Sequence, residues 1–148
     1  MEINQGFGFQ LDKTLKKIIT VYIKQFENIG INLSIEQWVI LQSIYNLGEN
    51  ASQVEISKIR YRNRATTSRV ISGLEKKGLI KKERFEGDQK RFRLVITPAG
   101  IKLVKKALPI VYQLRDVGKD NIDENEFNIF LKVLDQLWNN YEAFEKDS

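Results

Sequence analysis

The spacing of apolar residues changes at Gly78, and this change constrains the fold more than any other feature of the sequence. Before the glycine, apolar side chains recur every three or four residues, as on one face of a helix that follows an Asn63 N-cap. After it, in "LIKKERFEGDQKRFRLVIT", apolar and polar residues alternate on both sides of a turn at "EGDQ". The pattern predicts a helix that ends at a left-handed glycine, followed by a β-hairpin with a basic tip. The inward positions of that helix are Thr67, Val70, Ile71 and Leu74.

Another short helix precedes this one, with a tight turn between them. The segment "SQVE", from Ser52 to Glu55, has the spacing of a capping box, and the helix that it opens should rest on Ile56 and Ile59. Two short helices joined by a tight turn, the second of which exposes small and charged side chains, are typical of a helix-turn-helix. We therefore predict a helix-turn-helix followed by a basic hairpin.

Two helices precede this unit in the sequence. From Gln10 to Glu27, apolar residues form a helical stripe that stops at Gly30. The capping box "SIEQ" (34–37) opens a second helix that is apolar nearly all round. A helix without a polar face is expected to be central in the fold.

Two long helices follow the hairpin. Thr97 and Pro98 supply an N-cap and a first-turn proline for one helix, which Pro109 should kink, and the last helix should begin at the box "DENE" (123–126). This last helix has eight large apolar residues along one face. They are Phe127, Phe130, Leu131, Leu134, Leu137, Trp138, Tyr141 and Phe144.

An apolar stripe of this size near the end of a chain requires a partner surface. The partner is either the N-terminal helix of the same chain, a second copy of the chain, or both. We predict a homodimer, with residues 1–30 and 98–148 as the helical dimerisation region and residues 31–97 as a separate domain that contains the helix-turn-helix and the hairpin. The residues predicted to form the dimer interface are Leu11, Leu15, Leu134, Leu137, Trp138, Tyr141 and Phe144.

The composition excludes several classes of function. The chain has no cysteine and no histidine, which excludes thiolate nucleophiles, Ser-His-Asp triads and zinc sites built on these residues. Its acidic residues are scattered, so we predict neither an enzyme nor a metal or cofactor. No apolar run approaches the ~18 residues that a membrane span needs, and no secretory signal is visible. We therefore expect a cytoplasmic protein without a membrane partner.

The positive charge is concentrated in one segment. The chain carries a net charge of +5, and residues 58–93 hold thirteen Lys or Arg against four acids, which makes this segment +9 and the rest −4. A basic segment of this kind is either a solubilising face or a surface for a polyanion. Its concentration in the helix-turn-helix and the hairpin favours a polyanion.

The order of these elements resembles the MarR family of bacterial winged-helix transcriptional regulators. The resemblance covers essentially the whole chain and is carried by three segments. They are "SQVEISKI" (52–59), "RATTSRVISGLEKKGLI" (64–80) and "GDQKRFRLVITPAG" (87–100).

The sequence departs from the family pattern at two places. The family commonly has Leu and a second aliphatic residue where this chain has Arg60 and Arg62, so the turn is unusually basic. Its wing usually reads Asp-x-Arg, whereas here Lys90 stands in the place of the arginine. Either Lys90 substitutes, or Arg91 or Arg93 takes over, and we predict Lys90 together with Arg91.

The resemblance implies a homodimer that binds double-stranded DNA. The second helix of the unit would enter the major groove, where Arg can grip guanine, and the hairpin tip would reach the minor groove. For Arg64 and Arg69, an ion pair with an acid such as Glu75 is the competing explanation. Two such lobes fit half-sites about 34 Å apart, which predicts an inverted-repeat operator in a bacterial nucleoid. The predicted DNA-binding residues are Arg62, Arg64, Thr66, Ser68, Arg69, Ser72, Lys81, Lys82, Arg84, Lys90, Arg91 and Arg93.

Two further expectations concern a small-molecule effector and an alternative function. The resemblance implies a cleft in which a small aromatic or lipophilic effector acts, and Tyr22, Phe26, Trp38 and Tyr45 are the candidate lining residues, although aromatic residues at helical spacing usually belong to a core. The alternative function is a DNA-binding or protein-interaction module that uses its basic face without reading sequence.

Overall fold

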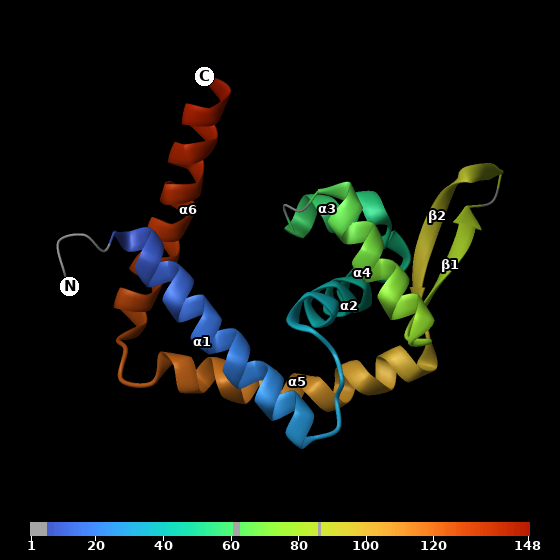
Figure 1. Cartoon of the computed structure of the whole chain (residues 1–148), viewed down its shortest axis with the longest axis horizontal. Helices are drawn as coiled ribbons and strands as arrows, with labels where there is room; N and C mark the ends of the chain where they lie inside the picture. Colours follow the sequence, from blue (N-terminus) through green and yellow to red (C-terminus); the bar gives the residue numbers. More distant parts are fainter. Residues whose placement is uncertain (1–5, 61–62, 86) are drawn as a thin grey trace. The chain divides into compact units, whose positions relative to one another are not determined.

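The computed structural model describes residues 6–60, 63–85 and 87–148 and forms two compact units, Met1–Val111 and Tyr112–Ser148 (Figure 1). Within the described residues, helices and a hairpin follow one another in the predicted order. The elements are α1 (Phe7–Asn28), α2 (Ile35–Leu47), the 3-10 helix η1 (Gly48–Asn50), α3 (Gln53–Arg60), α4 (Arg64–Lys76), β1 (Ile80–Phe85), β2 (Asp88–Ile96), α5 (Pro98–Lys119) and α6 (Glu124–Lys146).

The core of the first unit is built around α2. Trp38, Ile40 and Leu41 of this helix are buried together with Ile44, which confirms that the all-round apolar helix is central. The other elements of the unit each contribute buried side chains to the same cluster. These are Phe26 of α1, Ile56 of α3, Thr67, Ile71 and Leu74 of α4, Ile80 and Leu94 of the hairpin, and Val104, Ala107 and Val111 of α5.

One predicted core position of α3 is wrong. Ile56 is fully buried, but Ile59 is 44% exposed. Three residues of an α-helix advance 300°, so Ile59 lies about 60° away from Ile56 and close to the end of a helix of only eight residues. The packing of α3 therefore rests on Ile56.

Local signals at the ends of the helices are confirmed. The Ser34 hydroxyl accepts from the Gln37 N–H at 3.1 Å while the Gln37 side chain accepts from the Ser34 N–H at 3.1 Å, which completes the capping box of α2. Asn63 accepts from the Thr66 N–H at 2.8 Å and begins α4. At the other end of α4, Gly78 has a φ of +73°, and the Leu79 N–H bonds back to the Leu74 carbonyl at 3.1 Å.

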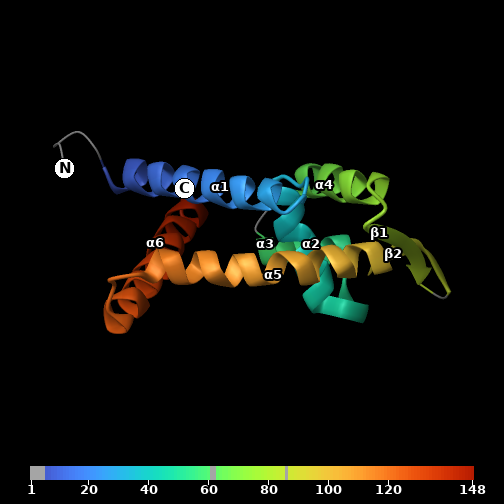
Figure 2. The ribbon, with the colours of Figure 1, turned by 90° about the horizontal axis from the view of Figure 1, so that it is seen from below.

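The hairpin is antiparallel and lies next to the C-terminal end of α4 (Figure 2). Its register runs from Ile80↔Ile96 to Arg84↔Phe92 and then shifts between Arg84 and Phe85. The N–H of Leu94 also bonds to the Ala51 carbonyl at 2.9 Å, which ties the hairpin to the segment before α3. The hairpin is thus anchored at its base.

A close contact fixes α5 to the base of the hairpin. The Thr97 hydroxyl accepts from the Gly100 N–H at 3.1 Å and donates to the Gly78 carbonyl at 2.7 Å. A Cβ at Gly100 would collide with the Leu79 carbonyl oxygen and would lie 2.6 Å from Cγ1 of Ile96. Only glycine fits this position, so the start of α5 has one docking geometry.

The second unit contains the end of α5 and all of α6. Helix α5 continues through Pro109 without interruption as one helical element. Asp123 is the N-cap residue of α6, but its side chain makes no capping hydrogen bond, so the predicted box at "DENE" is wrong. Asp123, Glu124 and Glu126 still place negative charge at the positive end of the helix dipole. The predicted division into residues 1–30, 31–97 and 98–148 stays a prediction.

Candidate nucleic-acid interface

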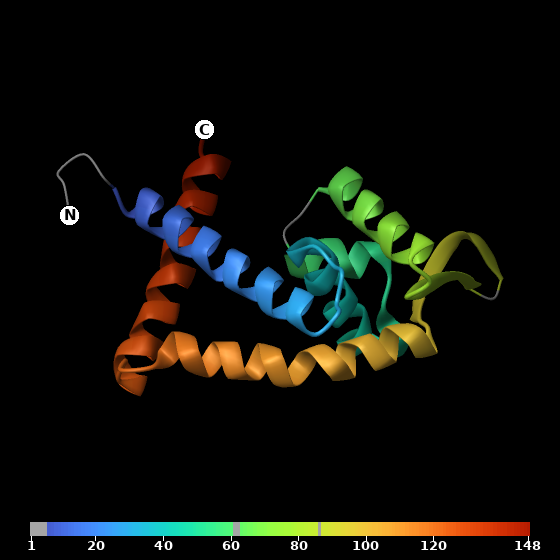
Figure 3. The same ribbon diagram turned by 60° about the horizontal axis from the view of Figure 1, so that its bottom comes forward.

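Helix α4 lies beside α2 and α3 (Figure 3) and packs on them with one face, while its short polar and cationic side chains lie on another face. Arg64 and Arg69 are exposed, while Thr66, Ser68 and Ser72 are half-buried. The Arg69 guanidinium donates to the Thr66 hydroxyl at 3.4 Å. Among the described residues, no ion pair involves either arginine, so both charges remain available to a ligand.

One face of the hairpin holds a small charge cluster. The Glu83 carboxylate accepts from Arg93 at 2.9 Å and lies 3.2 Å from the Lys81 ammonium. The hydrogen bonds from Arg93 and then Lys81 hold the pKa of Glu83 below its usual value, so the carboxylate is ionised at neutral pH. Two of the predicted DNA-binding cations therefore share one intramolecular anion.

Two other arginines of the hairpin lie over aromatic rings. The Arg91 guanidinium carbon is 4.8 Å from the centroid of the Phe85 ring, and that of Arg84 is 5.6 Å from the Phe92 ring. Both distances are within the ~6 Å range of cation–π attraction. Arg84 and Arg91 are exposed, and no carboxylate among the described residues pairs with them.

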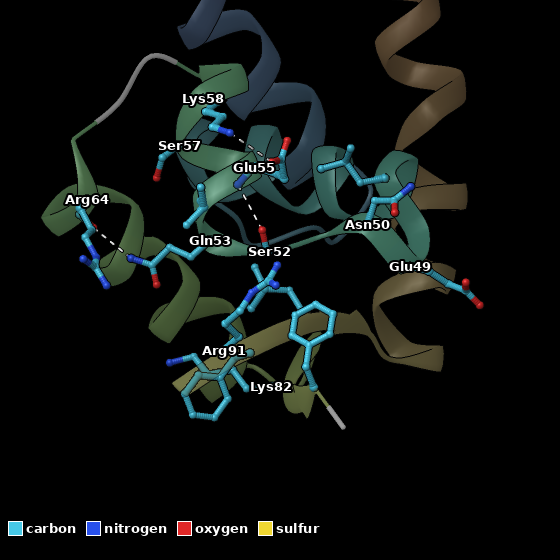
Figure 4. A pocket seen from close by; sticks show the side chains of 15 residues that line it. Glu49, Asn50, Ser52, Gln53, Glu55, Ser57, Lys58, Arg64, Lys82 and Arg91 are labelled. Carbon is cyan, nitrogen blue, oxygen red and sulfur yellow. Dashed lines mark hydrogen bonds and ion pairs between the residues drawn. The ribbon is translucent and has the colours of Figure 1, made fainter. Parts of the chain in front are cut away.

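A groove of about 1170 Å³ lies between α3, the start of α4 and the hairpin (Figure 4). In Figure 4, Arg64 lies on one side of it, Gln53 in the centre, and Lys82 and Arg91 on the other side. The Gln53 side chain donates to the Arg64 carbonyl at 3.3 Å and so joins the starts of α3 and α4. Three predicted DNA-binding cations from separate parts of the sequence thus line one groove.

The sequence did not single out the contribution of α3 to this groove. Gln53, Val54 and Lys58 of α3 line it, whereas the sequence predicted only the packing role of Ile56 and Ile59 in this helix. The signal that the sequence does carry is the apolar Val54 beside the polar Gln53, and Val54 is 60% exposed in the structure. Of the predicted DNA-binding residues, Arg62 lies outside the described residues, as does the side chain of Lys90.

The four aromatic residues considered for an effector cleft are packing residues in this structure. Phe26 and Trp38 are buried, with ring centroids 5.4 Å apart in an edge-to-face pair, and Tyr22 meets Phe26 at 6.4 Å. Tyr45 is half-buried against the same core. None of the four lines the groove described above, and their role in binding an effector stays a prediction.

The apolar faces predicted for dimerisation are open to solvent in the single chain. Leu11 and Leu15 of α1 are exposed, and α6 has no buried residue at all. On α6, Leu134 and Leu137 are half-buried, while Trp138, Tyr141 and Phe144 are exposed, the last at 73%. Each unit therefore has an apolar surface that its own residues do not cover.

The described residues contain no gathered group of three or more acidic side chains that would hold a metal ion. Across the same residues, every helix is either too short or too polar to cross a bilayer. The features that gather at one surface are instead cations, short polar side chains and aromatic rings.

Comparison with known proteins agrees with this geometry. Residues 33–92, which contain α2, the helix-turn-helix and most of the hairpin, match the model of the MarR family. The S. aureus MepR–DNA complex has a TM-score of 0.83 at 20% identity, over 91% of this chain and 98% of that one.

Two further solved structures share the fold. An E. coli MarR mutant complexed with operator DNA has a TM-score of 0.79 at 16% identity, over 88% of this chain and 91% of that one. Bordetella bronchiseptica BpsR, whose DNA binding is regulated by 6-hydroxynicotinic acid, has a TM-score of 0.80 at 19% identity, over 93% and 96%. The predicted mainly α fold with a small β-hairpin wing is confirmed, and the match is to regulators rather than enzymes. Residues 33–92 of this chain thus match the model of the MarR family, and solved winged helix-turn-helix regulators share its fold.

Proposed function

We propose that this protein is a homodimeric regulator that binds an inverted-repeat operator in double-stranded DNA and reads its sequence with α4. The observation that carries the proposal is the open face of α4, where Arg64 and Arg69 stand exposed among short polar side chains. A helix can enter the major groove only if its outward side chains are short or can reach base edges. The solved MepR and MarR complexes with DNA support the same assignment.

The groove and the hairpin extend this surface beyond α4. Lys82 and Arg91 lie across the groove from Arg64, so a DNA strand leaving the major groove would pass between cations on both sides. These contacts give affinity without sequence choice, whereas Arg69 in the major groove would give discrimination of about 1–3 kcal/mol. The cytoplasmic, nucleoid-associated location is part of the same proposal.

The dimer follows from the uncovered apolar faces. Large apolar side chains on α1 and α6, such as Leu15 at 56% exposure and Tyr141 at 61%, are left uncovered by the described residues of the chain, and apolar faces of this kind mark surfaces of association. A second copy of the chain would cover them and would present two α4 helices to half-sites about 34 Å apart.

A small aromatic or lipophilic effector is the finer part of the proposal. Its support is the regulation of BpsR by 6-hydroxynicotinic acid. An effector would release the protein from DNA only if it bound more tightly to a conformer in which the spacing of the two α4 helices does not match the half-sites. The coupling free energy between effector binding and DNA binding is typically about 1–3 kcal/mol. The aromatic residues Tyr22, Phe26, Trp38 and Tyr45 are the candidates for contact, once the core around them opens.

The decisive experiment compares operator with random DNA. Fragments selected from genomic DNA would supply the operator, and binding would be titrated over several salt concentrations for the wild type, Arg69→Ala and the control Arg115→Ala. We expect a steep fall of affinity with salt for all three proteins, and a loss of discrimination only for Arg69→Ala. Arg115 is a matched control because it is an arginine of the second unit that lies over the Tyr112 ring.

Equal affinity of the wild type for operator and random DNA would defeat the proposal. It would favour the alternative, a module that uses the basic face without reading sequence. Sedimentation or light scattering tests the dimer separately, because a mass of 17.3 kDa in solution would identify a monomer.

A further inference from the structure

The hairpin holds its cations in two chemically different ways. Arg91 and Arg84 lie over the rings of Phe85 and Phe92, at 4.8 and 5.6 Å from the ring centroids. Arg93 and Lys81, in contrast, share the carboxylate of Glu83. All of these cations belong to one two-stranded sheet, so the difference lies in the neighbour that holds each one.

A ring and a carboxylate have opposite effects on the availability of a guanidinium. The carboxylate accepts the N–H groups at the edge of the guanidinium and cancels its charge. The ring attracts the flat face of the guanidinium, leaves the N–H fork at its edge free, and leaves the charge intact. Within the described part of the chain, Arg91 and Arg84 are thus restrained without a counter-ion, whereas Arg93 is restrained by a carboxylate that it shares with Lys81.

The register places Arg84 and Phe92 opposite each other as direct cross-strand partners, with residues 80, 82 and 94 on the same face. Phe85 and Arg91 lie beyond this pair, past the register shift between Arg84 and Phe85. Both rings and Arg91 line the groove together with Lys82. The two arginine–aromatic pairs therefore follow one another toward the tip of the hairpin, with both rings beside the same groove.

Ordinary core packing does not explain the two rings. Phe92 is 41% exposed, and Phe85 is half-buried beside the open groove. Leu94, two residues after Phe92 on the same face, is the residue that enters the core. The core therefore does not require the Phe92 ring, and its recorded contact is with the Arg84 guanidinium.

We propose that Phe85 and Phe92 are positioning residues of the wing, which hold Arg91 and Arg84 in extended, charged conformations ready to bind DNA. Arg91 is then the principal described wing contact with DNA, and Arg93 and Lys81 contribute less. The inference rests on the proposed function, because it concerns affinity for the operator. Preorganising a long side chain raises affinity by reducing the rotamer entropy lost on binding.

A double-mutant cycle tests the Phe85–Arg91 pair. Phe85→Leu keeps an apolar side chain of similar size but removes the ring, and Arg91→Gln removes the charge. We expect Phe85→Leu to weaken operator binding by about 2- to 5-fold per wing, the range of an exposed cation–π contact. In the Arg91→Gln background, the same change should have no further effect.

The conservative variant separates positioning from a merely structural role. Phe85→Trp keeps a ring with a stronger cation–π attraction and should restore wild-type affinity or exceed it. The corresponding change Phe92→Leu should show the same dependence on Arg84, with a smaller effect because that contact is longer. Thermal unfolding of each variant, followed by circular dichroism, should match the wild type.

The outcomes distinguish this inference from the proposed function. If the wild type shows no preference for the operator, the proposed function fails, and the same cycle measured on random duplex DNA still tests whether Phe85 acts through Arg91. If the wild type prefers its operator, the proposed function stands, and two results would overturn the positioning role. One is an equal loss of operator affinity from Phe85→Leu in the wild-type and Arg91→Gln backgrounds. The other is a Phe85→Trp variant that binds the operator as weakly as Phe85→Leu.

Discussion

Helices α2 and α6 differ in whether other elements of the chain bury their apolar residues. Helix α2 has 13 residues, five of which are buried, while α6 has 23 residues, none of which is buried. Both are rich in large apolar side chains, so apolar content does not explain the difference. The first unit completes a core from its own elements, whereas α6 has its apolar face uncovered. The comparison teaches that the first unit covers its apolar residues with its own elements, and it predicts that the C-terminal helix requires a partner surface.

The comparison is tested most strongly by truncating one phenylalanine in each of the two regions. Phe26 is fully buried and meets the rings of Tyr22 and Trp38, so Phe26→Ala should cost about 3–5 kcal/mol of unfolding free energy. Phe144 is 73% exposed, so Phe144→Ala should leave the unfolding of the first unit unchanged. Urea denaturation followed by tryptophan fluorescence would measure both.

Protein concentration is the control for this pair. If the α6 face is covered by a second copy, the effect of Phe144→Ala should appear as weaker association and should grow on dilution. The effect of Phe26→Ala should persist at every concentration. An equal, concentration-independent loss in both variants would mean that α6 is part of a core within one chain.

A smaller effect on stability is expected from substituting two glycines of α5. Gly100→Ala forces a methyl group against the Leu79 carbonyl and Cγ1 of Ile96, and should destabilise the first unit by about 1–3 kcal/mol. Gly118→Ala adds a methyl group in open space at the other end of α5, and should stabilise the helix by up to about 1 kcal/mol. Thermal melts of the two variants should therefore move in opposite directions. A stabilising Gly100→Ala would show that the joint between the hairpin and α5 yields easily.

The sequence predicted those parts of the fold that depend on neighbours within about four residues. Caps such as Ser34 and Asn63, the left-handed stop at Gly78, and the change of period after it are all local signals. The box at 123–126 failed although its residue types were correct, because residue types do not fix the rotamer that makes the bond.

The site was predicted less completely, because its chemistry depends on contacts between strands and helices. The sequence identified the cations of the hairpin, but their state depends on which residue lies opposite, and the shift between Arg84 and Phe85 changes that pairing near the tip. The tight fit of Gly100 is invisible for the same reason, since it arises from a carbonyl 21 residues earlier in the chain. The residue types therefore predicted that the surface is positively charged, whereas the strand register determined which of its cations pair with a carboxylate.

The smallest effect is expected from removing one carboxylate in the hairpin or, for comparison, one carboxylate on α6. Glu83→Gln and Glu145→Gln both raise the net charge of the chain by one, but the first change lies within the basic hairpin and the second on α6. The Glu83 carboxylate stays ionised at neutral pH, since Arg93 and then Lys81 hold its pKa low, and its contribution to stability is lost only when the pH falls through that lowered pKa. Glu83→Gln should release both cations, tighten DNA binding by a few-fold at low salt, and steepen the salt dependence by about one to two units of slope.

Glu145→Gln should change neither quantity if the position of a charge, and not the total, governs binding. Filter-binding titrations over a range of salt concentrations measure the two slopes, and identical behaviour of the variants would show that DNA responds only to the overall charge of the protein.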